Sequence, residues 1–132
     1  MIVVDASALV SAVLKADSIP EQAVLRAEDV DVFALSAAAD AEISEVLNRP
    51  KFARAIPAAR RQHFLQLLRN EAVWFEPSTR ITDCRDAKDN MYLELTFAAG
   101  AETIISSDDD LLIVHPWRGV RILRPADYLA AT

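Results

Sequence analysis

The feature that most constrains the fold is the alternation of short apolar runs with longer segments of helical spacing along the whole chain. The strand-like runs lie at residues 2–4, 31–35, 73–75, 103–106 and 120–123. Between them we expect helices over about 7–15, 20–28, 37–48, 57–70, 87–99 and 108–113, with a last helix from Pro125. Gly100 is a natural left-handed cap after the 87–99 helix. Strands that alternate with helices predict an α/β fold with a central, mostly parallel sheet flanked by helices.

Length and composition favour one globular domain over residues 1–132. The chain has 132 residues, of which 52% are hydrophobic and 26% charged, so it is long enough to bury roughly two-thirds of its unfolded surface. No apolar run approaches the ~18 residues of a membrane span. The apolar start lacks a basic region and carries Asp5, which argues against a signal peptide. The single cysteine, Cys84, excludes an intrachain disulfide and a cysteine-based zinc site, and we expect a cytoplasmic protein.

Two acidic residues directly follow predicted strands. Asp5 comes after the run 2–4 and Asp108 after the run that begins at Thr103. In open parallel sheets, ligands bind outside the carboxyl ends of the strands. Two further acids belong to predicted helices: Glu42 lies at the edge of its core-facing stripe, and Asp89 shares a stripe with Leu93. We therefore expect these four carboxylates to converge on one site.

Several acids of these segments have a simpler structural alternative. Asp86, Asp108 and Asp110 are of the type that caps helices, and Asp89 in a first turn would favour the helix dipole. Carboxylates held close together raise each other's pKa unless a cation joins them. An all-oxygen site of this kind suits Mg²⁺ or Mn²⁺. The pattern therefore predicts metal-assisted chemistry on phosphate.

The charge is unevenly distributed. The chain has a net charge of −6, yet residues 46–70 hold six basic residues and no acid. Four of them are candidate contacts to an RNA backbone: Arg49, Lys51, Arg60 and Arg61. The alternatives are a solvated helical face or a face for a partner protein.

The chain lacks the sequence motifs of several reaction classes. With two glycines in the chain there is no glycine-rich phosphate cradle and no dinucleotide fingerprint. His63 and His115 have no partner motif. A phosphatase with an aspartyl nucleophile would carry a second Asp two residues after the first, where this chain has Ser7.

Taken in order, these segments resemble the PIN-domain family, and most closely the PIN-family toxin components of toxin–antitoxin systems. The segments that carry the resemblance are Val4–Val10, Ala41–Ile43, Arg49–Phe52, Asp86–Leu93, Ile105–Leu112 and Arg121–Leu129. The resemblance implies a Rossmann-like sheet and Mg²⁺- or Mn²⁺-dependent ribonuclease activity. It also implies a homodimer and a cognate antitoxin protein that silences the enzyme.

The resemblance also implies roles for particular residues. The family's acids fall on Asp5, Glu42, Asp89 and Asp108, with Asp110 as a frequent fifth metal ligand, and the supporting polar positions are Ser7 and Ser107. Ala6 and Ala87–Lys88 depart from the family pattern but leave the four acids in place. The sequence thus predicts hydrolysis of RNA phosphodiesters. Two alternatives remain: a catalytically silent module that binds RNA or protein, and a metal-dependent phosphatase.

Overall fold

The computed structural model describes all of residues 1–132 and has a parallel sheet at its centre. Strand β1 (Ile2–Val4) pairs with β4 (Thr103–Ile105), and β4 pairs with β5 (Arg121–Leu123), all in parallel. A second parallel pair joins β2 (Ala34–Leu35) to β3 (Val73–Trp74). A bridge between Ile2 and Phe33 connects the two sheets, which gives the spatial order β3-β2-β1-β4-β5. The predicted α/β architecture with a parallel sheet is confirmed.

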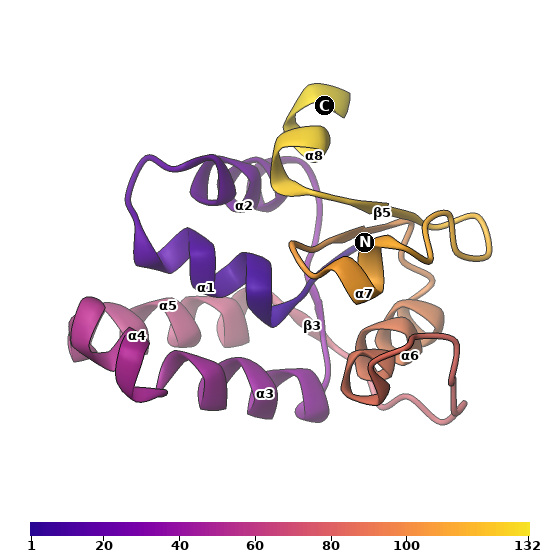
Figure 1. Cartoon of the computed structure of the whole chain (residues 1–132), viewed down its shortest axis with the longest axis horizontal. Coiled ribbons are helices and arrows are strands. Elements are labelled where there is room, and N and C mark those ends of the chain that lie inside the picture. The colour runs from indigo at the N-terminus through magenta and orange to yellow at the C-terminus, as the bar shows by residue number, and fades with distance from the viewer.

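Eight α-helices surround the sheet. They are α1 (Ala6–Leu14), α2 (Ile19–Val30), α3 (Ala37–Leu47), α4 (Pro50–Ala55), α5 (Ala58–Glu71), α6 (Asn90–Ala99), α7 (Asp109–Leu112) and α8 (Pro125–Ala131). Figure 1 shows α1 to α5 gathered on one side of the strands and α6 on the other. Helix α1 packs against α2, α3 and α5, whereas α6 contacts β1 and β2. None of the helices combines the length and the apolar character needed to cross a membrane.

Local sequence explains most of the helix boundaries, with two differences from expectation. Gly100 ends α6 with φ 63°, as expected for a left-handed cap. Pro50 begins a separate short helix, α4, because proline fits the first turn, where no backbone N–H is needed. The predicted 87–99 helix begins as a 3₁₀ turn, η1 (Ala87–Asp89), before α6.

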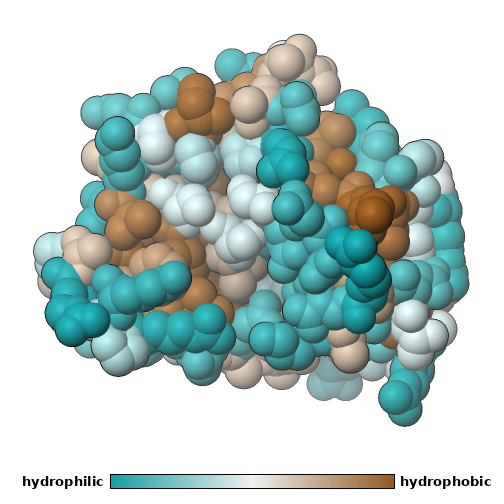
Figure 2. All heavy atoms as spheres, viewed as in Figure 1, coloured by the Kyte–Doolittle hydropathy of each residue, from teal (hydrophilic) through white to brown (hydrophobic).

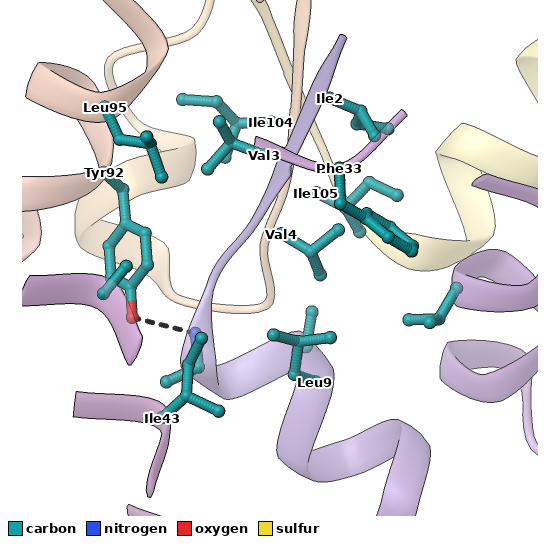
Figure 3. Packing of buried hydrophobic residues seen from close by; sticks show 14 of the residues in the cluster. Ile2, Val3, Val4, Leu9, Phe33, Ile43, Tyr92, Leu95, Ile104 and Ile105 are labelled. Carbon is teal, nitrogen blue, oxygen red and sulfur yellow. Dashed lines mark hydrogen bonds between the residues drawn. The ribbon is translucent and has the colours of Figure 1, made fainter. Parts of the chain in front are cut away.

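The buried strands and helix faces form one hydrophobic core. Thirty-three buried residues belong to a single cluster. In Figure 3 the strand residue Val4 lies beside Leu9 of α1, and the hydroxyl of Tyr92 from α6 reaches the start of α1. Apolar atoms also reach the surface, and one such patch in Figure 2 occupies the position of α1 in Figure 1. The core fixes the carboxyl ends of β1 and β4 and the first turn of α6 relative to one another.

A carboxylate cluster at the carboxyl edge of the sheet

Asp5 and Asp108 lie at the point where the sheet reverses its strand order. They follow the ends of the neighbouring strands β1 and β4, in which Val4 is paired with Ile105. From β1 the chain goes on to β2 on one side, while β4 lies on the other side. This switch point is where open α/β sheets bind ligands. Each Asp caps the helix that follows, Asp5 for α1 and Asp108 for α7.

Asp5 is buried and held by three hydrogen bonds. Its Oδ1 accepts from the Ser7 hydroxyl at 2.7 Å and from the Ala8 N–H at 3.0 Å, and its Oδ2 accepts from the Ser106 hydroxyl at 2.5 Å. Burial raises the pKa of Asp5 to about 6, because the three hydrogen bonds only partly offset desolvation and Asp108 adds repulsion. The carboxylate is therefore held in one orientation, but its charged form is disfavoured unless a cation lies nearby.

The serines connect the loop after β1 to the loop after β4. The Ser106 hydroxyl also accepts from the Asp108 N–H at 2.9 Å, and the Ser7 hydroxyl accepts from the Ser107 N–H at 3.1 Å. The side chain of Ser107 is exposed, whereas Ser106 is fully buried. Ser7 thus links Asp5 to the loop after β4. On the β4 side the hydroxyl comes from Ser106, and Ser107 contributes its backbone.

Asp89 brings a third carboxyl group to this point from η1. It is buried, and its Oδ2 has no hydrogen-bond partner. The pKa of Asp89 is raised to about 8, first by burial, then by the facing Asp108 carboxyl, with smaller contributions from the charges of Asp86 and Asp5. The fold therefore brings Asp5, Asp89 and Asp108 together, and the Asp108 charge raises the pKa of the other two.

Asp86 and Asp110 complete the tightest part of the cluster. One carboxylate oxygen from each of Asp86, Asp89 and Asp110 lies within 4.8 Å of the others. Asp86 is also the expected helix cap, since it accepts from the Lys88 N–H at 3.1 Å. Asp110 is paired with Arg85 at 2.6 Å. From the sequence, Asp86 was expected only as a cap. Its spacing of three from Asp89, which places both on one face of a helical turn, is the signal that indicates a shared site.

Glu42 reaches the site through a tyrosine instead of joining the three close oxygens. Its Oε1 accepts from the Tyr92 hydroxyl at 2.6 Å, and that hydroxyl accepts from the Ala6 N–H at 3.1 Å. Burial and Glu42 raise the pKa of Tyr92, which stays a neutral donor. Tyr92 was not among the residues predicted from the sequence, although a buried tyrosine hydroxyl usually has a polar partner. Glu45 is exposed and bound to Arg49, in agreement with its assignment to the opposite face.

The four basic candidates are largely engaged within the protein. Arg49 forms two hydrogen bonds with Glu45. Arg60 donates to the Val13 carbonyl at 3.0 Å and pairs with Glu21, and Arg61 donates to the Ala53 and Ile56 carbonyls. Lys51 lies 4.8 Å from the centre of the Phe52 ring. Among the four, only the Lys51 ammonium lacks a hydrogen-bond or acidic partner, so contact of this segment with RNA stays a prediction.

The chemistry of these donors fits a hard divalent cation. All the close ligand atoms are carboxylate oxygens, the type that Mg²⁺ and Mn²⁺ prefer. The unpartnered Oδ2 of Asp89 is a free acceptor inside the cluster. A cation would also offset the repulsion that raises the pKa of Asp89 and Asp5. The residues that can hold the cation are Asp86, Asp89 and Asp110, with Asp5 and Asp108 beside them.

The raised pKa values predict how the stability of the metal-free protein depends on pH. Above about pH 4 the folded protein keeps protons that the unfolded chain has lost, on Asp5 up to about pH 6 and on Asp89 up to about pH 8, so its stability falls as the pH rises. We expect a loss of at least about 1.4 kcal/mol between pH 5 and pH 8, equivalent to one unit of pKa. Urea denaturation in EDTA at both pH values measures it. A metal-free protein as stable at pH 8 as at pH 5 would contradict the prediction.

Comparison with known families identifies the chain. A family model described as the PIN domain matches residues 1–110, which include every acid of the cluster. The chain therefore belongs to the PIN-domain family. A comparison with curated proteins finds no match. PIN domains are generally metal-dependent nucleases, and the carboxylate cluster agrees with that class.

Proposed function

We propose that residues 1–132 form a single PIN domain that hydrolyses RNA phosphodiester bonds as a Mg²⁺- or Mn²⁺-dependent endoribonuclease. The observation that carries the proposal is Asp89, a buried carboxyl group that faces Asp108 and has a free oxygen. A buried carboxylate oxygen without a partner destabilises a fold, whereas a cation site needs such an oxygen. Its position at the switch point of the sheet, beside Asp5, supports a catalytic role.

The carboxylates have distinct roles in this proposal. Asp86, Asp89 and Asp110 hold the ion, and Asp5 and Asp108 border it from the ends of β1 and β4. When bound, the ion supplies positive charge that stabilises the negative charge developing on a phosphate under attack. Ser7 and Ser106 keep the Asp5 carboxylate in one orientation through their hydroxyl groups.

In this proposal Glu42 is the residue that binds and deprotonates the attacking water. The Tyr92 hydroxyl donates a hydrogen bond to Oε1 of Glu42, and Oε2 has no hydrogen-bond partner in the protein. Because Tyr92 also accepts from the backbone of Ala6, the carboxylate is tied to the start of α1, next to Asp5. We propose that Oε2 orients the water and accepts its proton.

We further propose that the enzyme is the toxin of a cytoplasmic toxin–antitoxin pair and works as a homodimer. Support for a protein partner comes from an apolar groove of about 180 Å³ formed by α1, α2 and α5. Glu28 and Glu71 line it, and each repels the other's charge. An antitoxin helix with apolar side chains and a basic flank would match this surface. Exposed Leu25 and Leu67 also border the groove.

One observation favours the alternative of a catalytically silent module. The Arg85 guanidinium already binds Asp110 and neutralises part of the cluster. If that ion pair persists, the remaining acids would bind a cation weakly. The pair is largely exposed, with 62% of the Arg85 side chain accessible, so a divalent cation needs to displace only a solvated side chain.

A cleavage assay tests the proposal. We expect the purified protein to cut a 5′-labelled single-stranded RNA internally with millimolar Mn²⁺ or Mg²⁺, and to be inactive in EDTA. The same preparation should leave a generic phosphomonoester intact. Metal binding without RNA cleavage would favour the silent module, and turnover of the phosphomonoester would favour the phosphatase.

A further inference from the structure

We propose that the cavity between residues 80–84 and the start of α6 binds the nucleotide that adjoins the cleaved phosphate, with Arg80 and Lys88 holding its phosphate group. This inference rests on the proposed ribonuclease function and adds a substrate subsite to it. The cavity measures about 330 Å³, which is at the lower end of the range for small-ligand sites.

The cavity is held open by hydrogen bonds from α6 to the loop that faces it. Oδ1 of Asn90 accepts from the Cys84 N–H at 2.9 Å, and Oε2 of Glu94 accepts from the Ile81 N–H at 2.9 Å. Asn90 and Glu94 are four residues apart, so they lie on the same face of the helix. The two contacts fix both ends of residues 81–84, and the cavity is preformed before any ligand binds.

The two cations of this cavity are free to bind an anion. Of the fourteen lysine and arginine side chains in the chain, five form neither an ion pair nor a hydrogen bond. They are Lys15, Lys51, Arg54, Arg80 and Lys88. Arg80 and Lys88 are exposed and line the same cavity. Two unpaired cations beside one cavity, on a chain of net charge −6, attract a phosphate group.

The cavity adjoins the carboxylate cluster through a shared segment. Cys84, Ala87 and Asn90 line the cavity, while Asp86 and Asp89 of the same segment belong to the cluster. The Cys84 thiol also donates to the Asp110 carbonyl at 3.2 Å. An RNA strand with one phosphate at the cluster would therefore place its neighbouring nucleotide at the cavity.

The remaining wall suits a base. Ile81, Ala87 and Met91 contribute apolar lining to the cavity beside its cations. Methionine is a flexible, polarisable contact that adapts to flat ligands. Phosphate contacts position a nucleic acid, and contacts to the base can add preference for particular nucleotides. The arrangement thus favours single-stranded RNA, in which a base is free to turn into the cavity.

The test compares two charge-matched double variants by RNA binding in EDTA, where no cleavage occurs. Arg80→Gln with Lys88→Gln should weaken the binding of a labelled single-stranded RNA about 10-fold. It should also reduce the slope of log K against log salt by about 0.7, the contribution of the one single-strand phosphate that the two side chains hold. The control, Lys15→Gln with Arg26→Gln, removes the same charge from the α1–α2 side and should change neither the affinity nor the slope by a comparable amount. Fluorescence anisotropy at several salt concentrations measures both quantities.

Cleavage by the wild-type protein in Mn²⁺, measured in parallel, separates the two proposals. If the wild type cleaves RNA but the Arg80 and Lys88 variant binds as tightly and with the same slope, the cavity assignment is wrong and the ribonuclease stands. An equal loss of RNA affinity in both double variants also overturns the assignment, because the loss would then follow from the change in net charge and not from the cavity. If the wild type does not cleave while binding still depends on Arg80 and Lys88, the cavity is supported and the nuclease proposal fails. Thermal unfolding of each variant verifies that it is folded.

Discussion

Replacing Asp89 by asparagine is expected to lower metal-dependent RNA cleavage by roughly 10²- to 10³-fold, the range found when one electrostatic contact to a reacting group is lost. Asparagine has nearly the same shape and fits the buried position of Asp89, but it brings no negative charge. The unpartnered Oδ2 becomes an amide or carbonyl group, which is a weaker ligand for a hard cation. Initial rates at saturating Mn²⁺ measure the loss.

The same substitution should leave the metal-free protein at least as stable as the wild type. Asp89 faces the Asp108 carboxyl, and removing one of the two ends their repulsion. If the variant keeps its stability but loses cleavage, Asp89 is a functional acid and not a structural one. The matched control is Asp109→Asn, which alters an acid that is 82% exposed and paired with Arg124. Full cleavage by Asp89→Asn, or an equal loss in Asp109→Asn, would remove the basis of the active-site assignment.

The second large effect concerns the metal itself. A cation that binds only the folded state stabilises it by about 2.7 kcal/mol at one hundred times its dissociation constant. For a chain of this length that corresponds to a rise of roughly 8 °C in the melting temperature. We expect this rise with Mn²⁺ or Mg²⁺ in differential scanning calorimetry, and a larger rise at pH 8 than at pH 5, because protons on Asp5 and Asp89 compete with the metal at low pH.

The same two variants serve as controls for the metal experiment. Asp89→Asn should lose most of the shift, since Asp89 is central to the three close oxygens. Asp109→Asn should retain it, because Asp109 points to solvent. Sodium chloride at equal ionic strength accounts for general screening. If isothermal titration shows no binding at millimolar Mn²⁺, the carboxylates are a structural feature and the proposed chemistry fails.

Much of the fold could be predicted from the sequence because it depends on local patterns. Short, mainly apolar runs such as Ile2–Val4 and Thr103–Ile105 have the length and character of buried strands between helices. Once both are strands of a parallel sheet, Asp5 and Asp108 must meet at its carboxyl edge. Helical spacing likewise separated Glu42, which contacts Tyr92, from the exposed Glu45. The short helix α4 was missed because its six residues carry no periodic signal.

What the sequence by itself determined about this protein is the order of its strands and helices and the edge of the sheet at which its acids gather. The tertiary structure alone decided the partner of each polar group: Asp86 joins Asp89 and Asp110, Ser106 holds Asp5, and Arg61 caps α4 through the Ala53 and Ile56 carbonyls. The physical reason lies in the range of the interactions. Periodicity reports which face of an element is apolar, a property of neighbouring residues. Hydrogen bonds and charge repulsion act between side chains that only the packed core brings together, such as Tyr92 and Glu42, fifty positions apart in the chain.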